Sequence, residues 1–369
     1  MRNKHIVIDA RIRRSSTGRY VDRLLSHLQD IDKDTRYSVL LQPDDPWQPR
    51  AGNFTVVPCK YAQFSLNPLE QFGFAWQLYK LNANIVHFAM NQQPVLYFKP
   101  VITTTMDFTF LLYPRNKGDG VLLFWLKMAG YRFLFWLSNK RSKAIITITN
   151  YVKHELETTY PKTKGKITTT LLASEPPLTE AAVKPEGVVK NDKFLFAVGT
   201  AFPHKNLDGL VLAHKLLLKK HPNLKLYMAG KKEYYYNQLD TFIEQNTNTS
   251  LVSTLGFITD AELKYMYENA ACYVFPSFSE GFGLPALEAM VHSAPVASSN
   301  ATCLPEVCGS AAHYFDPHSP ADIAKAVDDI LSNNTLRADL VKKGHARVKQ
   351  FSWDRMAQQT LAVYKSVLI

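Results

Sequence analysis

Short apolar runs alternate with helical patterns along almost the whole chain, and this alternation is the feature that most restricts the fold. Several runs, such as HIVI, FLFAV and CYVF, are apolar without a polar residue at every second position. Strands buried on both faces of a parallel sheet have this composition. The sequence therefore predicts an α/β fold. The expected strands are His5–Ala10, Ser38–Gln42, Thr55–Cys59, Asn84–Ala89, Val101–Asp107, Ala144–Asn150, Phe194–Gly199, Lys225–Gly230, Val252–Phe257, Cys272–Ser277 and Ala294–Ser299.

The alternation restarts near Lys193, after a stretch over residues 174–193 that is rich in proline and charge and has no sustained period. Such a stretch is typical of a linker, and 369 residues are too many for one ordinary core. We predict an N-terminal α/β domain over 1–178, a C-terminal α/β domain over 179–350 and a terminal helix over 351–369. We expect a cleft where the carboxyl ends of both sheets open, because open α/β sheets bind ligands there.

The positive charge of the chain lies entirely in its first half. Residues 1–178 hold 24 Lys and Arg against 13 Asp and Glu, whereas residues 179–369 hold 19 of each. A one-sided basic field favours an anionic partner such as a membrane surface, although a purely solubilising surface explains the charge equally well. No basic-aromatic module of the nucleic-acid-binding kind is present in the sequence, so we expect no nucleic-acid partner.

The cysteines and the first residues favour a cytoplasmic location. The four cysteines form no CxxC pair and no metal-ligand cluster, which is typical of free thiols in a reducing compartment. The N-terminal sequence has only a three-residue apolar run before Asp9 and is interpreted as a first strand, not as a secretory leader.

The stretch FPSFSEGFGLPALEAM, residues 275–290, carries two glutamates eight positions apart around a glycine-rich bend. A buried strand should precede the bend, and Pro285 fits the first position of a following helix. The unpaired amides and the dipole at such a helix start favour an anion. Glu280 would lie before the bend and Glu288 about one turn inside the helix, and Lys205 follows another predicted strand. This set suits a ligand with hydroxyls on both sides of its phosphates.

The segment over residues 122–143, LLFWLKMAGYRFLFWLSNKRSK, is the main feature of the first half. A helix that is apolar nearly all round is either buried or in contact with lipid, and a basic cluster follows it, as in helices that lie on anionic membranes. For most of the segment we favour a packed helix that leads into the next strand. Shallow contact with an anionic membrane surface, peripheral and on the cytoplasmic side, remains the alternative.

The chain resembles the retaining glycosyltransferases of family 4, which have the GT-B fold of two Rossmann-like domains. The resemblance is strong over about 194–365 and is carried by the paired-glutamate stretch together with LPEV, LGFITDAEL, GTAFPHKNL, FDP and the tail FSW. In the first half it rests on IVIDAR, TGRYVDRLL, NIVHF and TTTMDFTF. It implies that the terminal helix crosses back to brace the N-terminal domain.

The resemblance also implies roles for single residues. Glu288 would hold the ribose of a nucleotide sugar, Glu280 would contact the donor sugar, and Lys205 would neutralise the diphosphate. The backbone of Gly281, Phe282, Gly283 and Leu284 would wrap the sugar and the distal phosphate. The remaining donor-binding candidates are Gly199, Thr200, Gly256, Phe257, Gly18 and Arg19. No metal and no cofactor are expected, because the helix start and the lysine supply the positive charge.

The sequence departs from the family pattern in four places. Thr200 stands where an arginine is frequent, Met106 replaces a histidine before Asp107, the first glycine loop is shortened around Gly18, and Ser293 replaces a usual glycine. Asp107 is a candidate catalytic and acceptor-side residue, or else a cap for the next segment. His87 is a candidate acceptor contact, or else a structural histidine.

Together these features predict a hexosyltransferase that moves a mannose- or glucose-type sugar from a nucleoside-diphosphate sugar, with retention of configuration. The acceptor would be a glycan or a lipid-linked glycan in the synthesis of cell-surface polysaccharide or glycolipid. The alternative, which Met106 and the short glycine loop motivate, is a catalytically weak protein that binds a nucleotide sugar or a partner on the same fold.

Overall fold

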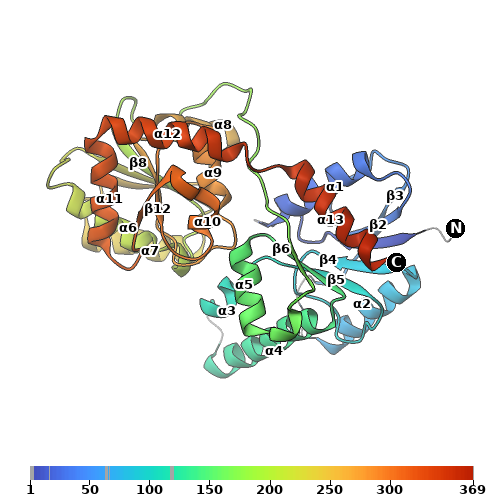
Figure 1. The fold of residues 1–369 in the computed structure, drawn as a ribbon. Coiled ribbons are helices and arrows are strands. Elements are labelled where there is room, and N and C mark those ends of the chain that lie inside the picture. The colour runs from blue at the N-terminus through green and yellow to red at the C-terminus, as the bar shows by residue number, and fades with distance from the viewer. Residues whose placement is uncertain (1–3, 16, 63–64, 66, 117–119, 369) are drawn as a thin grey trace. The chain divides into compact units, whose positions relative to one another are not determined.

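The computed structural model describes residues 4–15, 17–62, 65, 67–116 and 120–368. The chain divides into two compact units, which we call the N-terminal unit (Met1–Leu172 with Ser352–Ile369) and the C-terminal unit (Ala173–Phe351) (Figure 1). The last helix thus belongs to the first unit. Each unit contains one fully parallel sheet, so the α/β class that the sequence predicts is confirmed. That the two sheets face each other across a cleft stays a prediction.

The sheet of the N-terminal unit has seven strands in the order β3-β2-β1-β4-β5-β6-β7. Its strands are β1 His5–Asp9, β2 Arg36–Leu41, β3 Phe54–Pro58, β4 Ile85–Phe88, β5 Val101–Thr105, β6 Ala144–Thr147 and β7 Ile167–Thr169. The first six were predicted, with ends that differ by at most three residues. The seventh was missed, because this three-residue edge strand contains two threonines and presents no apolar run.

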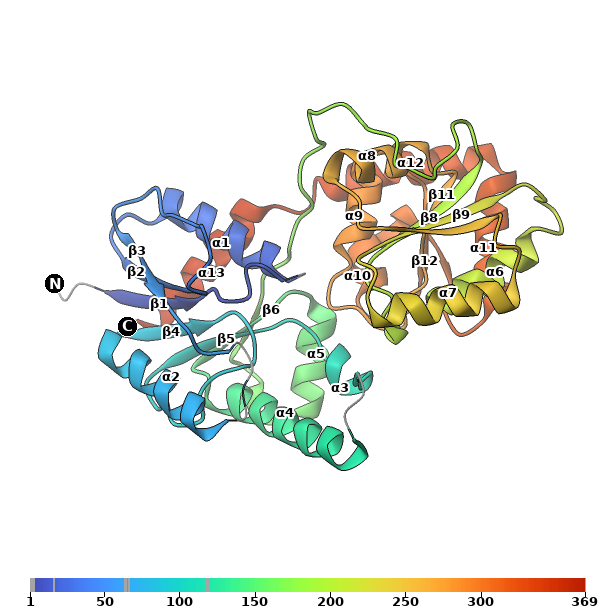
Figure 2. The same cartoon turned by 180° about the vertical axis from the view of Figure 1, so that it is seen from behind.

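The helices of this unit cover both faces of the sheet, with α1 and α13 on one side and α2 and α4 on the other (Figures 1 and 2). They are α1 Gly18–Ile31, α2 Pro68–Leu81, α3 Thr109–Leu112, α4 Val121–Arg141, α5 Asn150–Thr159, the 3-10 turn η1 Pro161–Thr163 and α13 Trp353–Val367.

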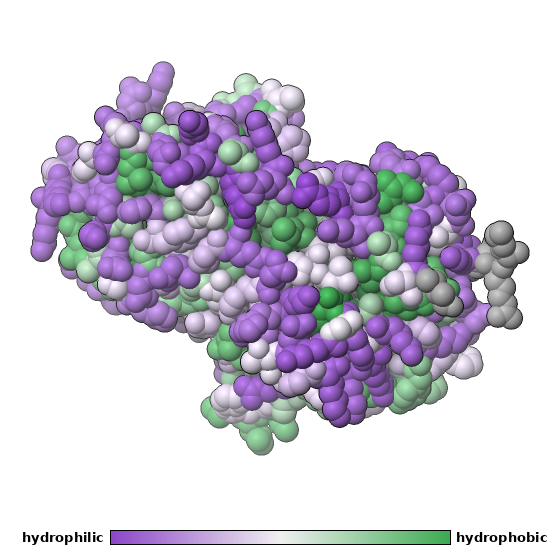
Figure 3. All heavy atoms as spheres, viewed as in Figure 1, coloured by the Kyte–Doolittle hydropathy of each residue, from purple (hydrophilic) through white to green (hydrophobic). Residues whose placement is uncertain are grey.

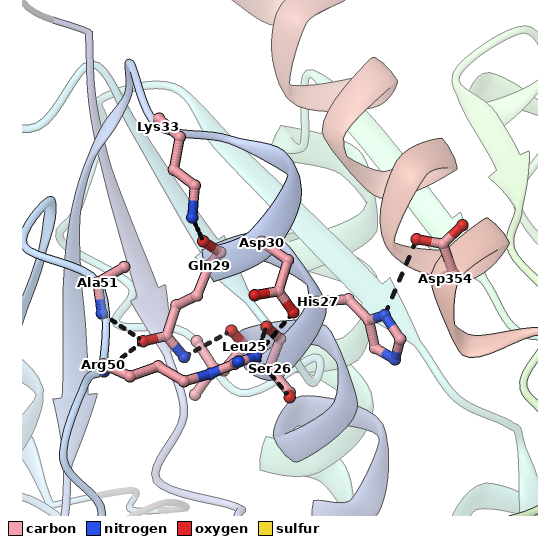
Figure 4. A network of polar contacts seen from close by, with 9 residues as sticks. All are labelled: Leu25, Ser26, His27, Gln29, Asp30, Lys33, Arg50, Ala51 and Asp354. Carbon is pink, nitrogen blue, oxygen red and sulfur yellow. Dashed lines mark hydrogen bonds and ion pairs between the residues drawn. The ribbon is translucent and has the colours of Figure 1, made fainter.

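The terminal helix α13 packs along α1. His27 of α1 lies 3.9 Å from Asp354 of α13, and the other end of the same polar network fixes α1 to the loop before β3 (Figure 4). In that loop Arg50 donates to Asp30 at 2.8 Å, and the Gln29 side chain accepts the backbone N–H groups of Arg50 and Ala51 at 2.7 and 3.1 Å.

His87 lies in the core of the N-terminal unit. The ring is fully buried, its Nδ1 lies 2.6 Å from the hydroxyl of Tyr364 on α13, and its Nε2 lies 2.8 Å from Oγ1 of Thr104 on β5. Both ring nitrogens therefore have partners inside the protein. These contacts favour the structural alternative for His87, and its contact with an acceptor stays a prediction.

The helix α4 differs from its prediction as a packed helix. Its second half is buried through Leu134, Phe135 and Leu137, whereas most of its first half is exposed. Among the described residues, α4 is a helix that is long enough and apolar enough to cross a membrane, judged by length and composition alone. Only 28% of its most apolar 18-residue segment is buried. The sequence could not show this, because apolar composition does not reveal which parts of a helix meet neighbouring elements.

The sheet of the C-terminal unit has six strands in the order β10-β9-β8-β11-β12-β13. They are β8 Phe194–Val198, β9 Lys225–Ala229, β10 Val252–Gly256, β11 Cys272–Phe275, β12 Val296–Ser299 and β13 Ala312–Phe315. The first five were predicted. The edge strand β13 was missed, since its middle residues His313 and Tyr314 are only half-buried and break the apolar run.

Two groups of helices cover this second sheet. The helix α6 packs against α7 and α11, and α9 packs against α8 and α12. The elements are η2 Pro203–Lys205, α6 Leu207–Leu217, α7 Tyr234–Asn246, α8 Asp260–Asn269, α9 Leu284–Val291, α10 Leu304–Cys308, η3 Gly309–Ala311, α11 Pro320–Ser332 and α12 Asn334–Val348. The capping box of Thr259 with Glu262 at the start of α8 is confirmed, and Ser319 caps α11.

The burial of His87 predicts an acid sensitivity of the N-terminal unit. Desolvation lowers the pKa of His87 from 6.5 to about 3, so the unfolded chain binds a proton at this residue that the folded chain does not. Stability that is present above pH 6.5 is lost as the pH falls towards 3. At pH 5 the loss from this group is about 2 kcal/mol. In the variant His87→Gln, the fall in unfolding free energy between pH 7 and pH 5 should be smaller by that amount.

The measurement is urea unfolding followed by tryptophan fluorescence, because all five tryptophans lie at positions 47, 76, 125, 136 and 353 and so report on this unit alone. His154→Gln is the matched control, since His154 is exposed on α5. If the unfolding free energy of His87→Gln and of the unchanged protein fell equally between pH 7 and pH 5, the conclusion that His87 is buried and neutral would be contradicted.

Candidate functional site

The bend between β11 and α9 needs glycine at position 283. Gly283 has φ +98°, a conformation that residues with a side chain rarely adopt. A Cβ atom there would lie 2.7 Å from Cδ2 of Leu304 and 3.1 Å from Cε1 of Phe275. Both the backbone conformation and the packing therefore exclude larger residues, and the chain can turn sharply from the strand into the helix.

The start of α9 has the character of an anion site. The helix begins at Leu284, with Gly283 as its N-cap, so that Pro285 is its second residue and not its first as predicted. In the part of the chain that the structure describes, no side chain caps this helix and no acidic residue lies in its first turn. The positive end of the helix dipole is therefore not neutralised by its own sequence.

Lys205 and Glu280 form an ion pair beside this bend. Nζ of Lys205 lies 2.6 Å from Oε1 of Glu280, and the two side chains are only 19% and 12% exposed. The backbone of Glu280 is held as well, because its N–H donates to Oγ1 of Thr302 at 3.2 Å and its carbonyl accepts from the thiol of Cys303 at 3.2 Å. The structure thus brings together the two residues on which the sequence interpretation depends most.

Asn206 fixes the loop that carries Lys205. Its φ of +53° ends the short turn η2 and starts α6. Its side-chain amide donates to the carbonyls of Pro276 and Pro317, at 3.1 and 2.7 Å, so one buried residue ties together the loops after β8, β11 and β13. The sequence interpretation missed Asn206. The available signal was an asparagine, which tolerates the left-handed conformation, directly after the lysine.

Three glycines lie side by side where β8, β9 and β10 end. The N–H of Gly230 donates to the carbonyl of Gly256 at 2.8 Å, and a Cβ on Gly230 would lie 2.0 Å from the carbonyl oxygen of Gly199. Gly199 and Gly256 have φ of +143° and +76°. Gly199 and Gly256 were predicted donor-binding candidates, and Gly230, which the sequence interpretation missed, contacts both of them. Phe257 follows this group with 80% of its surface exposed.

Glu288 lies inside α9 and accepts a hydrogen bond from the hydroxyl of Tyr267 at 3.2 Å. Tyr267 in turn stacks on His292. Burial raises the pKa of the neighbouring Tyr273 well above its usual range, and the negative charges of Glu288 and Glu280 raise it further. Both glutamates therefore lie near enough to this buried tyrosine for their charges to act on it. No pattern in the sequence pointed to Tyr267.

The other residues predicted around the bend are buried or partly buried. Gly281 and Phe282 are buried, and the Phe282 ring packs edge-on against Phe351, so that only its backbone is suited to the predicted contact. Leu284 is half-buried. The carbonyl of Thr200 accepts the N–H of Phe202 at 2.7 Å.

The predicted site residues of the N-terminal unit have clear local roles. Gly18 opens α1, where a Cβ would lie 1.8 Å from the carbonyl oxygen of Arg13, and Arg19 follows in the same turn. The carboxylate of Asp107 accepts the N–H of Thr109 at 2.9 Å, as the capping alternative predicted. Contact of Gly18 or Arg19 with a donor, and a catalytic role for Asp107, stay predictions.

No group of three or more His, Cys, Asp or Glu side chains within the described ranges could hold a metal ion. Lys205 and the start of α9 are two sources of positive charge at this edge. Independence from metal remains a prediction.

Comparison with known proteins links the second unit to a family. Residues 179–347 match the model of the family described as glycosyl transferases group 1. The chain is 32% identical over 231 residues to O-antigen chain mannosyltransferase B of Escherichia coli, covering 61% of each protein. It is 27% identical over 230 residues to O-antigen chain mannosyltransferase RfbU of Salmonella typhimurium, covering 62% of this chain and 61% of that protein. The match thus spans about three fifths of the length of these relatives.

Solved structures show the same fold over nearly the full chain. Sucrose-phosphate synthase from Thermosynechococcus elongatus aligns with a TM-score of 0.77 at 16% identity, covering 99% of each chain. WaaG, described as a glycosyltransferase involved in lipopolysaccharide biosynthesis, aligns with a TM-score of 0.73 at 14% identity, covering 96% of this chain and 98% of that one. At these identities the likeness establishes the fold, which is GT-B.

The geometry at Gly283 predicts a specific loss of stability. Gly283→Ala adds both a strained backbone, which costs about 1–3 kcal/mol, and a clash with Leu304. Gly187→Ala is the matched control, because Gly187 has φ +79° and a Cβ added to it would meet no atom within 4 Å. Urea unfolding followed by circular dichroism should show Gly283→Ala to be the less stable of the two by about 1–3 kcal/mol.

Adding Leu304→Ala to Gly283→Ala removes the atom that clashes. The double variant should therefore be more stable than the sum of the two single changes predicts. Equal stability of Gly283→Ala and Gly187→Ala would show that the bend has room for a side chain.

Proposed function

We propose that this protein transfers a hexose from a nucleoside-diphosphate sugar to a glycan acceptor, with retention of configuration, because residues 179–347 match the model of the family described as glycosyl transferases group 1. The observation that carries the proposal is the ion pair of Lys205 with Glu280, 2.6 Å apart, beside the uncapped start of α9. A cation, a helix N-terminus and two carboxylates at one sheet edge suit a pyrophosphate with hydroxyl-bearing groups on both sides.

In the proposed reaction the bond between the sugar C1 and the diphosphate oxygen breaks, and the diphosphate leaves with the bonding electrons. A bond from an acceptor hydroxyl to C1 forms, and the hydroxyl proton is released. Negative charge grows on the departing phosphate, so groups that are already oriented towards it stabilise the transition state most. Lys205 and the first amides of α9 take this role, and no metal is required for it.

The two glutamates orient the donor. Glu280 accepts hydrogen bonds from hydroxyls of the transferred sugar, and Glu288 accepts them from the ribose of the nucleotide. Carboxylates are strong acceptors for such hydroxyl groups. In the protein without ligand, Glu280 holds Lys205 near the position in which the lysine would meet the phosphates, which lowers the cost of ordering its long side chain.

Two further parts of the proposal rest on similarity and on cysteine chemistry. The relatives named above are O-antigen mannosyltransferases, which favours mannose as the sugar and a cell-surface polysaccharide as the product. The four cysteines are free and buried, which suits the reducing cytoplasm, where nucleotide sugars would be the substrates.

Loss of the lysine tests the proposed role in the transition state. Lys205→Met should lower kcat by roughly 100-fold, as expected for removal of one preorganised charge from a leaving group, with a smaller effect on KM. Steady-state kinetics with the donor identified below measures both constants. Lys215→Met is the control, since Lys215 is exposed on α6. An unchanged kcat in Lys205→Met would remove the lysine from the mechanism.

Loss of the second carboxylate tests donor binding. Glu288→Gln keeps the size of the side chain but weakens charge-assisted hydrogen bonds to the ribose, worth about 1.5–3 kcal/mol. The Kd of the donor should rise by roughly 10- to 100-fold. Calorimetry of nucleotide-sugar binding measures this, with Glu244→Gln on the exposed face of α7 as control. Equal Kd values would contradict the assignment.

The donor is identified first, by a thermal-shift panel of GDP-mannose and UDP-hexoses. Hydrolysis of that donor to free sugar then separates an enzyme from the alternative, a catalytically weak sugar-nucleotide-binding protein. Met106, which stands before Asp107 and is buried, favours that alternative because it supplies no titratable group. Binding without hydrolysis and without transfer to any acceptor would overturn the proposed activity.

A further inference from the structure

The outer side of α4 is an uninterrupted apolar stripe. Leu122, Trp125, Leu126, Phe133 and Trp136 are 76%, 52%, 60%, 48% and 37% exposed. Their spacing of three, one, seven and three positions places them on one face of a helix. Isolated exposed apolar residues are ordinary, but a continuous stripe on a folded unit marks a surface that contacts something else.

The opposite side of α4 is fixed to the unit. Phe135 is buried in a cluster with Ile145, Leu156 and Ile167. The buried hydroxyl of Ser138 accepts from the side chain of Asn91 at 3.0 Å. A helix held in this way cannot leave the sheet to cross a bilayer without breaking that core. Its exposed stripe is therefore suited to contact with the surface of a membrane, not to spanning it.

The neighbouring helix α2 continues the apolar surface. Leu69, Phe72 and Trp76, at positions i, i+3 and i+7, are 81%, 61% and 56% exposed. The loop after β4 lies between the two helices and adds Leu96 and Phe98, which are 43% and 67% exposed. We call these residues together with the α4 stripe the α2–α4 face.

Polar contacts join the parts of the α2–α4 face. The N–H of Val95 donates to the side chain of Gln71 on α2 at 2.9 Å, and Arg141 of α4 donates to the carbonyl of the same Val95. Both helices lie along the lower edge of the N-terminal unit in Figures 1 and 2, and Figure 3 shows hydrophobic side chains at the two ends of that edge, with hydrophilic ones between them in this view.

Cations stand directly beside the aromatic residues of this face. Lys80 lies 5.5 Å from the ring of Trp76, Lys140 lies 4.5 Å from the ring of Trp136, and the Arg141 guanidinium lies 4.7 Å from the ring of Phe98. Membrane proteins place aromatic rings in the same way at the level of the lipid headgroups. Lysine and arginine side chains beside such rings extend towards the lipid phosphates.

The charge of the same segments has one sign. Residues 68–81, 96–100 and 121–143 hold seven Lys and Arg and one Glu. A second copy that presented the same face would bring these positive charges against their like, which opposes self-association. An anionic lipid surface offers both the apolar depth and the opposite charge.

We propose that the α2–α4 face binds the N-terminal unit to the surface of an anionic lipid bilayer. The apolar side chains lie in the headgroup layer, and the Lys and Arg side chains contact lipid phosphates. The surface needs no nucleotide sugar to bind. Its consequence for the proposed function is that the acceptor is a glycan carried on a lipid, met at the membrane surface.

Co-flotation of the whole protein with vesicles tests the proposal. Vesicles of phosphatidylcholine with phosphatidylglycerol should carry the protein at low salt, and binding should fall several-fold at high salt. Vesicles of phosphatidylcholine alone should carry much less. Tryptophan fluorescence should shift to shorter wavelength on binding, because Trp76, Trp125 and Trp136 lie on this face.

The triple variant Leu122→Ser, Trp125→Ser and Leu126→Ser removes apolar area where α4 is most exposed. We expect at least a tenfold loss of vesicle binding, with unchanged nucleotide-sugar binding and unchanged hydrolysis of the donor in solution. The matched control, Val183→Ser, Val189→Ser and Leu216→Ser, changes exposed apolar residues of the C-terminal unit and should bind vesicles normally.

Equal vesicle binding by both triple variants, or no binding of the unchanged protein at low salt, would overturn the proposal. A dimer in sedimentation that the α4 triple variant abolishes would assign the face to a second copy instead. Because vesicle binding is measured without donor or acceptor, it can succeed where the proposed transferase activity fails, and the reverse.

Discussion

The constraint on which the site depends is the parallel pairing of β8 with β11. Parallel neighbours end at the same edge of the sheet, so the loop after each strand begins beside the other. Lys205 follows β8 and Glu280 follows β11, and they meet at 2.6 Å although 75 residues separate them in the sequence. Asn206 then holds the loops together through its bonds to two proline carbonyls. An antiparallel β11 would carry Glu280 to the far edge.

Charge at this edge is arranged so that no group is isolated. Glu280 is paired with Lys205, Glu288 accepts from Tyr267, and the start of α9 contributes a partial positive charge. A partly buried carboxylate without such partners would be costly. In the proposed reaction this arrangement accepts a pyrophosphate with little rearrangement, because the lysine is already held in place and the helix amides are fixed by the bend at Gly283.

Two apolar segments of the chain, the strand β11 and the helix α4, differ in how far they are buried. The strand CYVF is buried, as an apolar run between two glycine-rich or polar turns should be. The helix α4 is also largely apolar, yet only one side of its second half is buried, and its first half adds Trp125 and its neighbours to the surface. Composition measures how much apolar area a segment carries. The neighbouring elements of the tertiary structure decide how much of that area is buried.

Local patterns in the sequence determined the elements of this protein. Apolar runs specified eleven strands, the capping box set the start of α8, and Gly283 with Pro285 set the bend before α9, because strand propensity, capping and positive φ depend on residues adjacent in the chain. Tertiary structure alone decided that His87 is tied to Tyr364 and that Thr302, Cys303 and Tyr267 support the two glutamates. Such contacts join residues tens to hundreds of positions apart, and strand order, which no single segment encodes, brings them together.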